Sequence, residues 1–100
     1  MKLWVDDVRH APGDCNWIWA NSVNEAILLI QVTEKECPFE LIDLDHDAGD
    51  YVSDGGDYIK LLDWLEYTNR NYPIHIHSMN PVGVQNMRTI IQKNGWTEIR

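Results

Sequence analysis

The sequence of 100 residues has little basic charge, little cysteine and no long apolar run. The chain has only 8 lysines and arginines against 16 aspartates and glutamates, which gives a net charge of −8. A surface that binds extended nucleic acid or an anionic membrane is therefore not expected. No run approaches membrane-spanning length, and no basic-then-apolar leader opens the chain. The 2 cysteines, Cys15 and Cys37, fit no zinc motif, so we expect reduced thiols in a cytoplasmic protein.

The length of the chain predicts a single folded domain that spans residues 1–100. Apolar residues make up 44% of the chain and include 5 tryptophans, which we expect in the core or at its rim. No repeat, linker or low-complexity segment interrupts the chain.

Short apolar runs alternate with helical patterns along the sequence. The apolar runs predict strands over residues 2–5, 17–20, 39–44, 73–77 and 96–99. The helical patterns predict helices from Ser22 to about Thr33, over 58–70, and from Asn80 to Gly95. Ser22 and Glu25 form a capping box, and Asn80 before Pro81 is typical of a helix start.

This alternation indicates an α/β fold with a parallel sheet, and right-handed crossovers leave few topologies. We predict a flavodoxin-like three-layer sandwich whose five-stranded parallel sheet has the order 2-1-3-4-5. The segment 8–16 between the first two strands contains Pro12 and Gly13 and is too short for a normal crossover helix. The first helix of such a fold is therefore lost or shortened.

Acidic and histidine side chains follow three of the predicted strands. These strands end in Asp6-Asp7-Val8-Arg9, Asp45-His46-Asp47 and His77-Ser78-Met79-Asn80. In open parallel sheets, ligands bind beyond the carboxyl ends of the strands, where these residues would meet. Clustered carboxylates either share protons or hold a cation. Oxygen ligands suit Mg²⁺, and nearby histidine favours Mn²⁺ or Zn²⁺, so we predict a metal-assisted phosphate site.

Simpler explanations also fit several of these residues. Asp6 and Asp7 could only terminate a strand, and residues 45–47 could form a solvated turn. Asp43 lies within a strand, where it could be a buried, paired carboxylate, and we leave it outside the site. His75 is also mid-strand, which favours a hydrogen-bonded subsurface histidine over a catalytic one.

Four further residues have both a structural and a functional interpretation. His77 lies at a strand end, where it could be either a hydrogen-bonded subsurface histidine or a catalytic one. Ser78 can donate a hydrogen bond to a phosphate oxygen. Asn80 could only cap its helix, although the N–H groups of such a helix start attract anions. Arg9 could reach a phosphate or form an exposed salt bridge.

Taken together, these residues resemble the receiver domain of two-component response regulators. They resemble a divergent branch more closely, the cyclic-phosphate processing receiver-like domain. The resemblance covers nearly the whole chain. It is carried by Leu3-Trp4-Val5-Asp6-Asp7-Val8-Arg9, Leu44-Asp45-His46-Asp47 and His75-Ile76-His77-Ser78-Met79-Asn80-Pro81-Val82-Gly83.

The resemblance implies a receiver-like fold and the processing of a cyclic phosphate on a nucleotide or an RNA end. It implies that Asp7 and Asp45 bind the metal or the phosphate and that Asp6 and Asp47 assist in this binding. His46 and His77 are additions that ordinary receivers lack. An ordinary receiver also has a lysine at the end of its fifth strand, and residues 96–99 contain none.

Three functions remain open at this stage. The first is a metal-assisted phosphoesterase for a small or terminal cyclic phosphate, with Asp45, His46 and His77 as catalytic residues. Its phosphate oxygens would be held by Ser78, Asn80 and Arg9. The second is a signalling receiver phosphorylated on Asp45, which the missing lysine disfavours. The third is a partner-binding domain without catalysis, since a fold does not fix a function.

Overall fold

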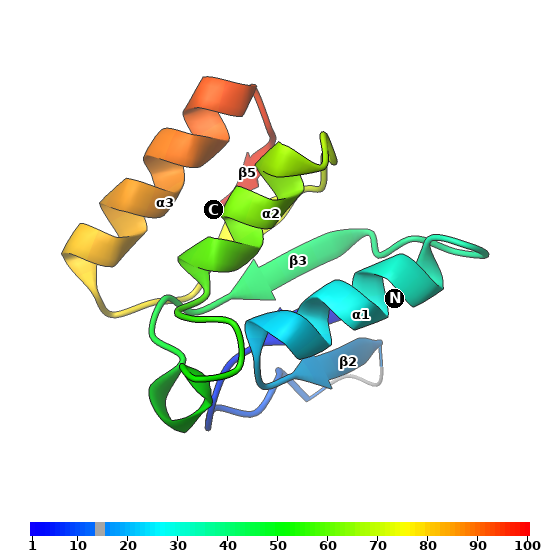
Figure 1. Cartoon of the computed structure of the whole chain (residues 1–100), viewed down its shortest axis with the longest axis horizontal. Coiled ribbons are helices and arrows are strands. Elements are labelled where there is room, and N and C mark those ends of the chain that lie inside the picture. The colour runs from blue at the N-terminus through cyan, green and yellow to red at the C-terminus, as the bar shows by residue number, and fades with distance from the viewer. Residues whose placement is uncertain (14–15) are drawn as a thin grey trace.

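The computed structural model describes residues 1–13 and 16–100, which form a five-stranded parallel sheet with helices (Figure 1). The strands are β1 (Lys2–Val5), β2 (Trp17–Ala20), β3 (Leu41–Leu44), β4 (Ile74–Ile76) and β5 (Glu98–Ile99). The helices are α1 (Val23–Thr33), the short 3-10 turn η1 (Gly49–Tyr51), α2 (Ile59–Tyr67) and α3 (Pro81–Asn94). The order β2-β1-β3-β4-β5, parallel throughout, confirms the predicted flavodoxin-like class and strand order.

One face of the sheet carries the hydrophobic core. Alternate strand residues point to this face because side chains in a strand alternate with a period of two. All three α-helices pack on it, and Figure 1 shows them on the same side of the sheet. Fully or almost fully buried residues from strands and helices make up this core: Leu3, Val5, Ile42, Leu44, Ile74, Ala26, Ile30, Leu61, Leu62, Leu65, Met87 and Ile91.

The opposite face carries no helix among the described residues. A row of side chains runs across it, since Trp4 pairs in register with Trp19 and Asp43, and Asp43 pairs with His75. The second helical layer of a three-layer sandwich is thus not formed by residues 1–13 and 16–100. The segment after β1 turns back instead, and the Trp4 indole N–H donates to the carbonyl of Arg9 at 2.7 Å.

Two of the three predicted helix starts are confirmed by side-chain caps, while α2 begins without one. The Ser22 hydroxyl accepts the backbone N–H of Glu25 at 3.0 Å. The Asn80 side-chain oxygen accepts the N–H of Gly83 at 3.0 Å, and α3 ends at Gly95 in the left-handed region. The third, fourth and fifth strands are shorter than predicted, because a strand extends only as far as its neighbour pairs with it.

None of the helices in the described ranges combines the length and the apolar character needed to cross a membrane. Cys37 is exposed and its thiol is free, whereas Cys15 lies outside the described residues.

Candidate functional site

Side chains from three neighbouring strands meet beyond the carboxyl ends of β1, β3 and β4. Asp6 follows β1, Asp45 follows β3 and His77 comes just after β4. One potential ligand atom from each lies within 4.8 Å of the others. The parallel register pairs the last residues of these strands, so the residues that follow emerge at the same level. We call Asp6, Asp45 and His77 the acidic cluster.

Asp6 is the most strongly held member of the acidic cluster, with only 1% of its surface exposed. Its Oδ1 accepts the backbone N–H groups of Val8 at 3.0 Å and Arg9 at 2.8 Å, and its Oδ2 lies 2.8 Å from His77 Nε2. Burial alone would raise the pKa of Asp6, but the hydrogen bonds from Arg9, Val8 and His77 outweigh burial and lower it. The carboxylate charge is therefore stabilised by the fold.

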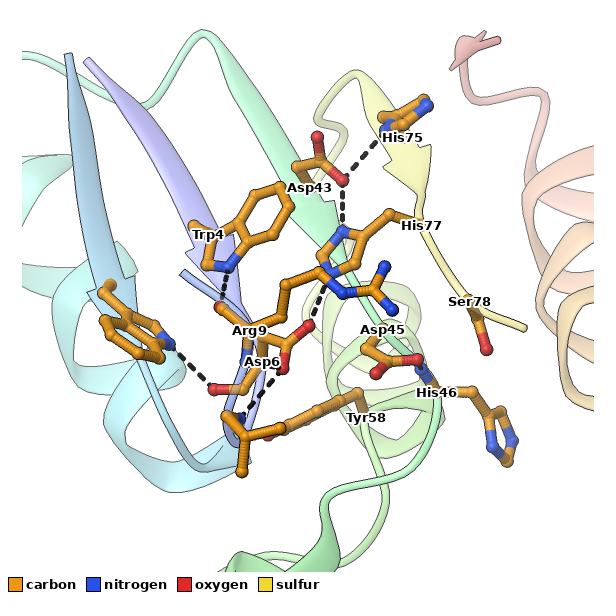
Figure 2. A network of polar contacts seen from close by, with 12 residues as sticks. Trp4, Asp6, Arg9, Asp43, Asp45, His46, Tyr58, His75, His77 and Ser78 are labelled. Carbon is orange, nitrogen blue, oxygen red and sulfur yellow. Dashed lines mark hydrogen bonds and ion pairs between the residues drawn. The ribbon is translucent and has the colours of Figure 1, made fainter. Parts of the chain in front are cut away.

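His77 lies between two carboxylates (Figure 2). Its Nε2 faces Asp6, and its Nδ1 lies 2.6 Å from Asp43 Oδ1. The imidazole stacks on the Trp4 ring with centroids 3.8 Å apart and planes 2° apart. The side chain is only 9% exposed. Burial alone would lower the pKa of His77, but Asp43 and Asp6 outweigh burial and raise it.

Asp43 is a buried, paired carboxylate, which confirms the interpretation of this residue given by its place within a strand. Its Oδ1 also lies 2.8 Å from His75 Nδ1, which confirms the expected hydrogen-bonded histidine in β4. The sequence signal for this group was an aspartate in the middle of an apolar strand and histidines at alternate positions of the next one.

Asp7 lies close to the acidic cluster but is more exposed than Asp6. Burial raises its pKa, and the negative charges of Asp6 and Asp45 raise it further. Gly49 of η1 packs directly on the Asp7 carboxylate, where an added Cβ would overlap Oδ2. The carboxylates of Asp6, Asp7 and Asp45 thus repel one another, which is the condition that a bound cation relieves.

The side chains of Asp45, His46 and Asp47, which follow β3, point in different directions. Asp45 Oδ1 accepts the backbone N–H of His46 at 2.7 Å, while no described group donates to its Oδ2. The His46 ring points away from the Asp45 carboxylate (Figure 2) and packs against Gly83 of α3. His46 Nδ1 lies 2.8 Å from Asp47 Oδ1, and Asp47 also faces the Asn80 amide at 3.4 Å. The structure therefore separates His46 and Asp47 from the acidic cluster.

The predicted phosphate-binding residues lie beside the acidic cluster. Ser78 Oγ accepts the backbone N–H of Asn80 at 3.1 Å, which leaves the hydroxyl hydrogen available. Asn80 caps α3 by accepting the Gly83 and Val84 N–H groups, and Pro81 has no N–H, so the first turn of the helix leaves the Val82 N–H for a ligand. Arg9 is exposed, and in the view of Figure 2 its side chain runs from its loop toward the cluster.

Tyr58 is a site residue that the sequence did not indicate, because an aromatic residue before a helix only suggests a core position. It is fully buried, and its hydroxyl donates to the carbonyl of Asn21 at 2.6 Å. Burial raises its pKa, and the charges of Asp7, Asp6 and Asp45 raise it further. Tyr58 thus lies beside the carboxylates on the buried side of the site.

The acidic cluster fits a divalent metal ion by its donor set. Two carboxylates and one imidazole are ligands that Mn²⁺ and Zn²⁺ accept, while the carboxylates alone also suit Mg²⁺. Burial raises the pKa of Asp7 and the charges of Asp6 and Asp45 add to this rise, so a cation beside these carboxylates would be favourable. The Asp-Asp-His cluster could therefore bind a metal ion.

Comparison with known proteins gives one match. The family model of the cyclic-phosphate processing receiver domain matches residues 1–93, which include the acidic cluster and nearly all of α3. No curated protein and no solved structure gives a significant match. The five-stranded parallel sheet in the order 2-1-3-4-5 agrees with a receiver-like fold. The chain belongs to the family of cyclic-phosphate processing receiver domains.

Proposed function

We propose that this domain is a metal-assisted phosphoesterase that opens a cyclic phosphate on a nucleotide or an RNA end. The observation that carries the proposal is the acidic cluster, whose potential ligand atoms lie within 4.8 Å of one another. The cluster stands beside Ser78 and the start of α3, so groups for a cation and for an anion are adjacent. Family membership supports a phosphate substrate, and a reducing, cytoplasmic location remains our expectation.

The carboxylates of Asp6 and Asp45 would hold the divalent ion, Mg²⁺, Mn²⁺ or Zn²⁺, with Asp7 adding negative charge beside them. When bound, the ion polarises a phosphoryl oxygen or activates water. Asp6 is suited to this role because its backbone hydrogen bonds fix its carboxylate in one orientation. The buried Tyr58 ring would exclude water from the buried side of these carboxylates, and electrostatic interactions are stronger where water is excluded.

Hydrolysis forms a bond between a water oxygen and phosphorus and breaks one phosphorus–oxygen bond of the cyclic ester. With the ion held by the carboxylates alone, His77 keeps its Nε2 proton, on the nitrogen that faces Asp6, and can give it to the leaving oxygen. The proton released by the water replaces the one given by His77, so the site ends with the protons it began with. His46 is the second acid–base candidate, although it is turned toward α3.

The phosphate oxygens would be held by groups on the α3 side of the acidic cluster. The Ser78 hydroxyl can donate one hydrogen bond, the Val82 N–H can donate another, and the positive end of the α3 dipole favours the anion. The Arg9 guanidinium can add charge from the opposite side. These donors stabilise negative charge as it develops on the phosphate.

Turnover of 2′,3′-cyclic nucleotides with Mg²⁺, Mn²⁺ and Zn²⁺ tests the proposal. We expect Asp45→Asn to abolish turnover and His77→Gln to lower it by about 10²- to 10⁴-fold. His46→Gln should cost less, because its ring lies away from the cluster. Asp63→Asn, on the solvent-exposed face of α2, is the matched control. Absence of turnover with every metal, or full turnover by Asp45→Asn, would contradict the proposal.

A signalling receiver is the second candidate, favoured by Asp45 Oδ2, which accepts no hydrogen bond from residues 1–13 and 16–100. In this case Asp45 would accept a phosphoryl group from a phosphodonor. Acetyl phosphate followed by intact mass spectrometry separates the two functions, because a stable gain of one phosphoryl group that Asp45→Asn abolishes indicates signalling. Calorimetry that detects neither metal nor phosphate binding would instead indicate a partner-binding domain.

A further inference from the structure

Asp43 has no role in the function proposed above, although it is a charged residue in an unusual place. It lies in the middle of β3 with only 6% of its surface exposed. A carboxylate removed from water costs free energy unless it is paired. Two imidazole nitrogens face its Oδ1, Nδ1 of His75 at 2.8 Å and Nδ1 of His77 at 2.6 Å.

We propose that Asp43 is a positioning residue that fixes the orientation of His77 in the site. It does so by accepting the Nδ1 hydrogen of His77, so that Nε2 is the nitrogen directed at Asp6. The consequence for turnover rests on the proposed function, whereas the orientation of His77 can be measured without it. Asp43 itself touches neither substrate nor metal.

Stacking on Trp4 explains why a single hydrogen bond can set this orientation. The two ring planes differ by 2° and their centroids are 3.8 Å apart, so the imidazole is confined to one plane. Trp4 is anchored in turn by its indole N–H, which donates to the carbonyl of Arg9. A ring held in one plane keeps two orientations related by a flip. Only one of them places Nδ1 on Asp43 and Nε2 on Asp6, and a carboxylate on one nitrogen selects it.

His75 provides an internal control for this proposal. It shares Asp43 Oδ1 with His77 and lies on the same face of β4, but its side chain is 34% exposed. No described contact joins His75 to Asp6 or Asp45. Removal of His75 therefore leaves the hydrogen bond between Asp43 and His77 in place.

The experiment measures the imidazole nitrogens of the metal-free protein by long-range ¹H–¹⁵N correlation, in the wild type and in Asp43→Asn, Asp43→Leu and His75→Gln. We expect a hydrogen-bonded Nδ1 proton on His77 in the wild type and in His75→Gln. Asp43→Leu, which has no acceptor, should lose this signature, and Asp43→Asn should weaken it because a neutral amide oxygen replaces the carboxylate, while urea denaturation shows both variants folded. Titration with Mn²⁺ alone should show affinity about 10- to 100-fold weaker in the Asp43 variants, because a misplaced His77 no longer orients the Asp6 carboxylate through Nε2.

The proposal is overturned if folded Asp43 variants keep the wild-type His77 signature and Mn²⁺ affinity. It is also overturned if His75→Gln loses the signature to the same extent as Asp43→Leu. Should Asp43→Leu fail to fold, the isosteric Asp43→Asn decides, because its neutral amide oxygen must give a measurably weaker Nδ1 hydrogen bond than the carboxylate does. If the wild type hydrolyses no cyclic phosphate, the proposed function fails, and the nitrogen signature still decides whether Asp43 orients His77.

Discussion

Gly49 shows how the absence of one side chain shapes the site at the residue scale. Its φ of +56° is a left-handed conformation that favours glycine, and a Cβ there would overlap the Asp7 carboxylate. Gly83 has the same relation to His46, whose ring occupies the space of the missing Cβ. Neither relation could be predicted from the sequence, because each joins segments whose packing is set by the whole fold.

Replacement of Gly49 by alanine should therefore disturb Asp7. We expect Gly49→Ala to lower the free energy of unfolding by about 1–2 kcal/mol, the cost of a left-handed alanine, and to weaken Mn²⁺ binding as Asp7 is displaced. Urea denaturation and Mn²⁺ titration measure the two effects. Gly13→Ala is the matched control, since nothing lies within 4 Å of a Cβ at Gly13. Equal effects of both substitutions would contradict the expected displacement.

Glu34 gives a prediction for pH at the same scale. Its carboxylate accepts hydrogen bonds from the Arg70 guanidinium and from Tyr72, and Arg70 above all lowers the pKa of Glu34. A lowered pKa in the folded state contributes stability at neutral pH that is lost as the pH falls through that pKa. Glu34→Gln should cost about 1 kcal/mol at pH 7 and progressively less in acid.

Denaturant midpoints measured between neutral pH and acid, below the ordinary glutamate pKa of about 4.3, check this expectation. Glu36→Gln, at an exposed position nearby, serves as the control. A difference between Glu34→Gln and the wild type that stays constant at all pH values would show that the ion pair contributes nothing measurable to stability.

The helices illustrate what could be predicted at the element scale. Their starts were predictable because caps are local, as Ser22 and Asn80 show. Strand order followed from alternation and handedness. The pairing of Asp43 with His77 could not be predicted, because it depends on the register between β3 and β4. The role of the segment after β1 was also missed, since the indoles of Trp4 and Trp19 bond its carbonyls only in the folded chain.

The cap of α3 allows a direct test at this scale. Asn80→Ala removes the acceptor for the Gly83 N–H and should destabilise the fold by about 1 kcal/mol. Asn80→Ser keeps a capping oxygen and should restore most of that loss. Chemical denaturation of both variants measures the difference. If serine and alanine prove equally destabilising, the contact of Asn80 with Asp47 matters more than the cap.

For the molecule as a whole, the sheet has two unlike faces. Helices cover one face with an apolar core, while the other carries a row that includes Trp4, Asp43 and His75. The acidic cluster lies at the edge where β1, β3 and β4 end, so its members belong to three different strands. Any ligand that binds all of them links these strands and stabilises the folded chain against unfolding.

A divalent ion should therefore raise global stability, and the rise should depend on Asp45. At about 100 times its dissociation constant, Mn²⁺ would add about 2.7 kcal/mol to the free energy of unfolding. We expect this gain in the wild type and in Asp63→Asn, and its loss in Asp45→Asn, measured by urea denaturation at constant ionic strength. The net charge of −8 makes the control necessary, because any cation screens repulsion in an acidic chain. An equal gain in stability in Asp45→Asn would show that Mn²⁺ acts by screening charge, and it would contradict metal binding at the acidic cluster.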